Sequence, residues 1–142
     1  MTEAGIPSRT ERRRHIAGLM EASGAWQVVE AHQPGTFGGK SPVATVHNGP
    51  VNWQALTSRR SGGKANYQMT FLVTNLVKRE DTGDAEDQLD DLLVALLDLV
   101  EKNPKAPGLW LDLRAQGPTE PDYFIIDGQQ YRGEVVRLVA TV

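Results

Sequence analysis

The chain has 142 residues, of which 39% are hydrophobic and 23% charged, and this size is typical of one domain with a single core. Its formal net charge of −3 argues against a dedicated nucleic-acid-binding domain, and the absence of cysteine excludes disulfides, thiol catalysis and thiolate metal sites. No long apolar run is present and the first residues lack the apolar region of an export signal, so we expect neither a membrane span nor a secretory leader.

The first predicted element is a helix over residues 9–22. Ser8 and Glu11 have the spacing of a capping box, and Gly24 supplies a stop signal. Apolar residues recur between them at helical intervals, at Ile16, Leu19 and Met20. We expect the arginines at positions 12–14 to lie mostly on the solvent side.

After Trp26 the hydrophobic period changes to two, which predicts strands. The alternating segments are residues 26–32, 43–47, 51–57 and 67–77. A glycine-rich loop joins the first two segments. A polar and basic loop over residues 58–66 joins the last two, which fit a long antiparallel hairpin.

The second helix has the clearest pattern in the sequence. Its predicted apolar stripe consists of Leu89, Leu92, Leu93, Leu96, Leu97 and Val100. Its first turn is acidic, which complements the positive end of the helix dipole, and Asn103-Pro104 ends it. Strands are then predicted over residues 109–115, 123–126 and 133–142, with a tight turn at Asp127-Gly128.

The predicted order is therefore α-β-β-β-β-α-β-β-β. Because turns and not crossover helices link the strands, we expect an α+β fold, with a mainly antiparallel sheet packed by two helices on one face. Residues 1–142 show no internal repeat and no linker, so we expect a single domain.

The stretch "HQPGTFGGKS", residues 32–41, is similar to a phosphate-binding loop. That loop requires a glycine five residues before its final Gly-Lys-Ser glycine, whereas position 34 is proline, and Gly35 comes one residue too late. Lys40 and Ser41 should also open a helix, but Pro42 and a β-branched segment follow. The sequence therefore argues against nucleotide binding, and we expect no cofactor.

Other chemistry is weakly indicated. His32 and His47 could lie on neighbouring strands with Glu30, as in a two-histidine, one-carboxylate metal site, although a solvated strand face explains them more simply. The acidic residues of the second helix lack the spacing of a calcium loop. No nucleophile, base and orienting group assemble, so we predict no metal, no catalytic residue and no enzyme.

Two charged surfaces remain. The predicted hairpin tip carries Arg59, Arg60 and Lys64, and the second helix carries an opposite charge. A chain with a basic arm and an acidic face can make head-to-tail contacts between copies, which close into a ring when the rotation allows.

The order of elements resembles that of the tail terminator proteins of long-tailed phages. The segments that carry the resemblance are "YQMTFLVTNLVKREDTGDAEDQLDDLLVALLDLV", "PGLWLDLRAQGP" and "YFIIDGQQYRGEVVRLVATV". They contain a long strand that leads into a helix with an acidic start, then a Tyr-x-Gly at Tyr131-Arg132-Gly133 and a valine-rich last strand. The N-terminal helix with its arginine cluster and the tryptophan-led strand fit the same pattern.

The resemblance implies a non-enzymatic virion protein. Copies would form a hexameric ring that caps the head-proximal end of the tail tube and contacts the head connector protein, while DNA passes through the lumen without being read. In this hypothesis Asp87, Asp90 and Asp91 face the channel or a subunit seam. The basic residues at the hairpin tip reach an adjacent subunit or ring.

The glycine-rich loop has a role of its own in this hypothesis. It is a docking loop with Phe37 as its apolar anchor, and so a further contact between subunits or rings. Two alternatives stay open, a head–tail connector (head-closure) protein and a monomeric α+β binding module. Ring formation separates the virion proteins from the monomeric module.

Overall fold

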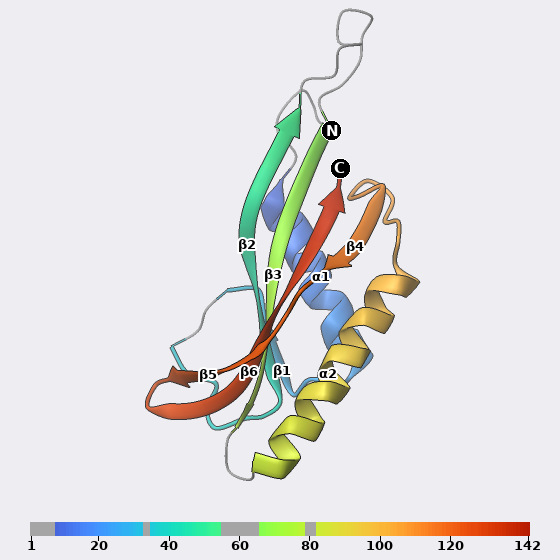
Figure 1. Ribbon diagram of the computed structural model, residues 1–142. Coiled ribbons are helices and arrows are strands. Elements are labelled where there is room, and N and C mark those ends of the chain that lie inside the picture. The colour runs from blue at the N-terminus through green and yellow to red at the C-terminus, as the bar shows by residue number, and fades with distance from the viewer. Residues whose placement is uncertain (1–7, 33–34, 55–65, 79–81) are drawn as a thin grey trace, which may run out of the picture.

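The computed structural model describes residues 8–32, 35–54, 66–78 and 82–142. In these residues the elements are two helices and a mixed, mostly antiparallel sheet of six strands (Figure 1). The α+β prediction is confirmed. The order is α-β-β-β-α-β-β-β, with one strand fewer than expected before the second helix.

Helix α1 spans Arg9–Ser23, one residue longer than predicted. The Ser8 hydroxyl accepts a hydrogen bond from the Glu11 backbone N–H at 3.2 Å, as the capping box requires. At the other end Gly24 adopts φ +77° and closes the helix. Both signals in the sequence therefore set the helix boundaries correctly.

The prediction that the arginines of α1 face solvent is wrong for Arg12, which is only 7% exposed. Its Nε donates to the carbonyl of Leu109 at 2.6 Å, and its Nη1 donates to the carbonyl of Ser8 at 2.8 Å. Arg13 reaches the carbonyl of Ala31 at 2.8 Å, whereas Arg14 is exposed. Arg12 is buried because peptide carbonyls satisfy its donors in place of water.

The sheet strands are β1 (Val28–Glu30), β2 (Val43–Gln54), β3 (Asn66–Lys78), β4 (Asp112–Gln116), β5 (Pro121–Ile126) and β6 (Gln129–Thr141). Their order is β1-β2-β3-β6-β4, and β5 pairs with β6 beside β4. All pairs are antiparallel except β1 with β2.

The segments predicted as separate strands before and after Asn48-Gly49-Pro50 form the single strand β2. The register with β3 shifts between Asn48 and Val51, so the interruption is absorbed as a β-bulge. Glycine suits this close approach, since a Cβ on Gly49 would lie 3.0 Å from the carbonyl oxygen of Thr70 and would require a small shift there.

Helix α2 spans Thr82–Lys102 and ends immediately before Asn103-Pro104, as predicted. Its buried stripe consists of Ala85, Leu89, Leu92, Leu96, Leu99 and Val100. Leu97 is instead 41% exposed, so its predicted place in the stripe is wrong. Leu99 is buried and Leu97 is not, because Leu99 lies on the side of α2 that packs against the sheet.

Both helices pack against one face of the sheet (Figure 1). The main core joins their apolar residues to the side chains of β3 and β6 that point to the same face, among them Phe71 and Leu138. A smaller core lies on the opposite face and consists of Phe37, Val43, Leu76 and Tyr131. The sheet is therefore covered by helices on one face and by a loop on part of the other.

Candidate interaction surfaces

The glycine-rich loop does not have the geometry of a phosphate-binding loop. Ser41 leads into strand β2 and not into a helix, and its backbone N–H donates to the side-chain oxygen of Gln27 at 3.0 Å. Its hydroxyl accepts the backbone N–H of Lys78 at 3.0 Å. The backbone N–H and the hydroxyl of Ser41 are thus engaged in holding the loop against the sheet.

Phe37 is a core residue and not an exposed anchor. Its side chain is 5% exposed, and its ring lies edge-on to the ring of Tyr131, with 6.0 Å between the ring centroids. The predicted docking role required an exposed ring. Burial against Tyr131 and Leu76 instead makes Phe37 the residue that holds the loop on the sheet.

The predicted basic contact residues Arg59, Arg60 and Lys64 lie outside the described residues. The structure therefore brings only the acidic half of the predicted charge pair into view.

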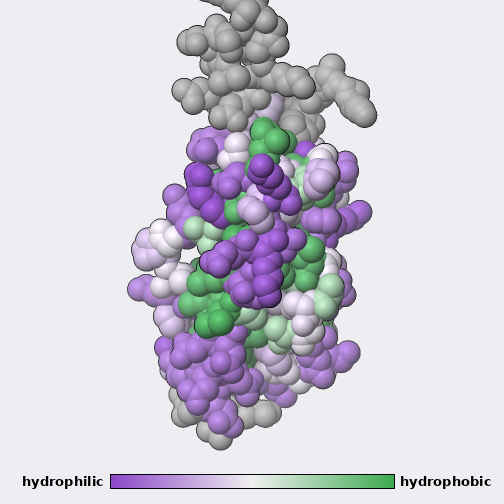
Figure 2. Space-filling model, turned by 90° about the vertical axis from the view of Figure 1, so that its right-hand side faces the viewer, coloured by the Kyte–Doolittle hydropathy of each residue, from purple (hydrophilic) through white to green (hydrophobic). Residues whose placement is uncertain are grey.

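The outward side of α2 is acidic. Asp87, Asp90 and Asp91, the predicted channel or seam residues, are all exposed. The other exposed acids of the described helix are Asp84, Glu86, Asp98 and Glu101. Figure 2 shows this side of the molecule, and hydrophilic residues dominate its lower end.

Partial neutralisation comes from two ion pairs. Arg132 of β6 bonds to Glu86 at 2.9 Å, and Lys102 bonds to Asp98 at 2.9 Å. The hydrogen bond from Arg132 lowers the pKa of Glu86. The pair of Lys102 and Asp98 is largely solvent-exposed and contributes little to stability, whereas Arg132 in the other pair is only 20% exposed. The remaining exposed acids of α2 form no ion pair with another described residue.

Beneath this surface lies a buried carboxyl group that the sequence did not reveal. Glu134 of β6 is 6% exposed, although it sits in the valine-rich last strand. Burial raises its pKa, and the nearby charge of Asp90 adds to that increase, while Arg132 opposes it. The acidic character of the α2 surface therefore extends into the seam between helix and sheet.

The histidines do not assemble a metal site. The His47 ring lies 2.7 Å from the hydroxyl of Thr45, and burial together with the charges of Arg13 and His32 lowers the pKa of His47. Among the described residues, no group of three histidine or acidic side chains is arranged to hold a metal ion.

Strand β5 exposes apolar side chains that sequence patterning did not single out. Tyr123 is 50% exposed and Ile125 is 72% exposed. Both point to the helix side of the sheet, because their partners in the ladder are Arg132 and Gln130. The guanidinium of Arg132 lies 4.5 Å from the centre of the Tyr123 ring. The period of two was visible in the sequence, but not which face would stay uncovered.

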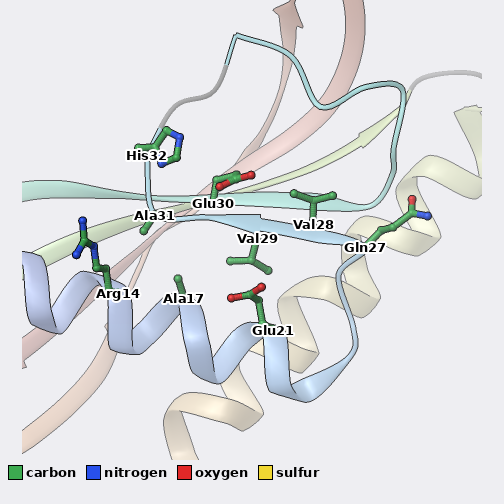
Figure 3. A pocket seen from close by; sticks show the side chains of 9 residues that line it. All are labelled: Arg14, Ala17, Glu21, Gln27, Val28, Val29, Glu30, Ala31 and His32. Carbon is green, nitrogen blue, oxygen red and sulfur yellow. The ribbon is translucent and has the colours of Figure 1, made fainter.

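A groove runs between helix α1 and strand β1 (Figure 3). It has a volume of about 520 Å³. Arg14, Ala17 and Glu21 project into it from α1, and Val29 of β1 and Ala31, which follows the strand, point toward them (Figure 3). The basic end of the groove lies at Ala31 and the acidic end at the last turn of α1.

Neither the known protein-family models nor the curated protein sequences contain a match to this chain. Within the described residues, neither helix combines the length and the apolar character needed to cross a membrane.

Proposed function

We propose that this chain is a structural protein of a phage virion, a tail terminator that forms a ring on the head-proximal end of the tail tube and joins it to the head connector. The proposal makes it a non-enzymatic protein whose partners are further copies of itself, the tube protein and the connector. It is supported by the α+β fold and by the elements from β3 onward, a long strand, a helix with an acidic start and a long last strand, which resemble the pattern of that family.

The observation that carries the proposal is the acidic surface of α2. Asp87, Asp90 and Asp91 lie together on the exposed side of one helix, with Glu134 buried behind them. A wall of this kind repels DNA phosphates over roughly the 8–10 Å Debye length of physiological salt. Such a surface suits a channel or a seam that DNA passes without binding.

The proposal is tested by incubating the protein with tail tubes of a long-tailed phage and imaging the tube ends by negative-stain electron microscopy. A tail terminator is expected to cap one end of the tubes and to stop further polymerisation of added tube protein. Binding to portal rings in place of tubes would favour a connector. A protein that binds neither and stays monomeric would contradict the proposal.

The role of the acidic surface has its own test. Replacing Asp87, Asp90 and Asp91 by lysine should leave the fold intact, because all are exposed, but should make the assembled protein retain DNA. The matched control replaces the same residues by asparagine, which removes charge without reversing it. Fluorescence anisotropy with labelled duplex DNA at low salt measures the difference. DNA retention by the unaltered protein would contradict a repelling wall.

A further inference from the structure

We propose that neighbouring copies join by adding strand β5 of one copy to the edge of strand β1 in the next, inside the groove beside α1. This inference rests on the proposed ring and names the contact that would build it. It combines two features of the described residues, an exposed apolar side chain on an edge strand and a groove beside another edge strand.

The first feature is the outer edge of β5. Asp127 and Gly128, with φ values of 51° and 74°, form a two-residue turn, so Ile126 and Gln129 close the hairpin with mutual hydrogen bonds. Alternation then directs the peptide N–H and C=O of Ile125 outward. In the described part of the chain, no strand pairs with that edge. The side chain of Ile125 is also exposed, which makes β5 prone to pair with a strand of another chain.

The second feature is the outer edge of β1. The parallel register places Val28 beside Val43 and Glu30 beside Thr45. The Lys78 N–H points to the β2 side, where it bonds to Ser41, so alternation along β3 also directs the peptide groups of Leu76 and Thr74 toward β2. Their partners Val43 and Thr45 therefore direct their own peptide groups toward β3, and Val28 and Glu30 are the residues that bond to β2. Val29 between them directs its N–H and C=O to the outer edge, which no described strand occupies. Its side chain points into the groove (Figure 3).

The two edges match in face and direction. Ile125 and Val29 both carry their outward peptide groups on residues whose side chains lie on the helix side of the sheet. Strand β5 runs antiparallel to β1, so a copy placed beside another in the same orientation brings the two edges together as an antiparallel pair. Val29 opposite Ile125 then forms a hydrogen-bonded pair, and the Ile125 side chain enters the groove beside Ala17.

Charge distinguishes this register from the one that is shifted by two residues toward Glu30. With Val29 opposite Ile125, Asp122 at the start of β5 lies opposite His32, and both side chains lie on the face of the sheet away from α1. At the acidic end, near Glu21, the docked strand carries only uncharged residues between positions 123 and 126. A shift by two residues would instead place Asp122 opposite Glu30, which like charges disfavour.

The level of the strands selects β5 over β4 as the donor. Across the sheet, one row joins Val29, Ala44, Asn75, Glu134 and Pro121. The row that starts at Val29 therefore reaches β5 at Pro121, four residues before Ile125. Pairing Val29 with Ile125 of the next copy shifts the strands by these four residues, and a closed sheet that runs around a ring requires such a shift. Strand β4 is connected across β6 and β3 to the part of β2 that contains the bulge and Pro50, and both features disfavour pairing of that edge with another strand.

The edge contact is tested with Ile125→Asp, which introduces a charge into the groove. The side chain is 72% exposed, so the monomer should fold and melt as the unaltered protein does, while assembly into rings is lost. The matched control is Leu111→Asp, since Leu111 is 70% exposed and lies outside the proposed contact. Native mass spectrometry reports the assembly state, and circular dichroism reports the fold.

A cross-link locates the contact independently. The chain has no cysteine, so His32→Cys and Asp122→Cys, made in separate chains and mixed, can form only one kind of mixed disulfide. Opposed side chains in an antiparallel pair lie about 5 Å apart, which suits a disulfide. The expected product is a covalent heterodimer that forms with Asp122→Cys and not with the control Arg114→Cys on β4.

The outcomes separate the two proposals. Rings that persist in Ile125→Asp, or cross-links equal for Asp122→Cys and Arg114→Cys, would overturn the β5–β1 contact and leave the tail terminator proposal standing. An unaltered chain that stays monomeric in solution and on tail tubes would overturn both. Loss of rings in Ile125→Asp alone, with the expected cross-link, would support the contact.

Discussion

The two faces of the sheet are buried in different ways. One face carries both helices and a broad apolar core that runs from α1 to β4. The other is covered near the start of β6 by the glycine-rich loop, through the small core of Phe37, Val43, Leu76 and Tyr131. Because stabilisation by burial grows with apolar area, the helix side supplies most of the stability. The loop side fixes the β5–β6 hairpin that we propose as the contact between copies.

The largest expected effect is on the helix side. Leu96→Ala removes a fully buried side chain of α2 and should destabilise the fold by about 2–5 kcal/mol. Leu97→Ala, one residue further along, is the matched control, because Leu97 is 41% exposed and should cost less than about 1 kcal/mol. Urea unfolding measures both. Equal costs would show that the observed rotation of α2 is wrong.

The next effect is on the loop side. Phe37→Ala should cost about 3 kcal/mol, near the low end for a buried phenylalanine, since the small core can partly collapse. Phe37→Leu is the control that keeps apolar volume. Urea unfolding gives the cost, and hydrogen exchange should show faster exchange in the hairpin of β5 and β6. If Phe37→Ala left the free energy of unfolding unchanged, Phe37 would not be a core residue, and the prediction of an exposed anchor would stand.

A third effect tests how closely the strands approach on the loop side. A Cβ on Gly133 would lie 2.6 Å from Leu76 and 2.8 Å from the carbonyl oxygen of Asn75. Gly133→Ala should therefore destabilise by about 1–3 kcal/mol. Gly18→Ala is the control, since nothing lies within 4 Å of its Cβ position and alanine favours the helix by up to about 1 kcal/mol. Thermal melts should move in opposite directions.

The smallest effect is a pH dependence on the helix side. Burial raises the folded-state pKa of Glu134 above its unfolded value, so stability falls as the pH rises from the unfolded pKa through the folded pKa. Glu134→Gln stays uncharged and should be more stable than the unaltered protein at pH 7. The advantage should vanish below about pH 4, where the unfolded carboxyl is also protonated. Thermal melts across this range measure it, with Glu101→Gln as an exposed control. An advantage that persists in acid would refute the assignment.

Local signals in the sequence were sufficient for the helices and most strands. Ser8 and Gly24 set the ends of α1, and Asp127-Gly128 marked the hairpin, because caps and turns depend on neighbouring residues. Long-range packing was not predictable in this way. The burial of Arg12 depends on the carbonyl of Leu109, which is distant in sequence, and the burial of Phe37 depends on Tyr131.

The candidate site was predicted only in part. The acidic residues of α2 lie exposed together, as a helical period required. The exposed face of β5 and the groove beside β1 were missed, because a strand pattern does not tell which edge of a sheet remains unpaired. These features follow from strand order, which is a property of the whole fold.

The most direct test of the central claim is native mass spectrometry of the unaltered protein over a concentration series, with negative-stain images of the same samples and tail tubes added to a parallel set. The account predicts closed rings of one stoichiometry, in solution or on the tube ends, and their loss in Ile125→Asp but not in Leu111→Asp. A protein that stays monomeric at every concentration and leaves tube ends uncapped would contradict it.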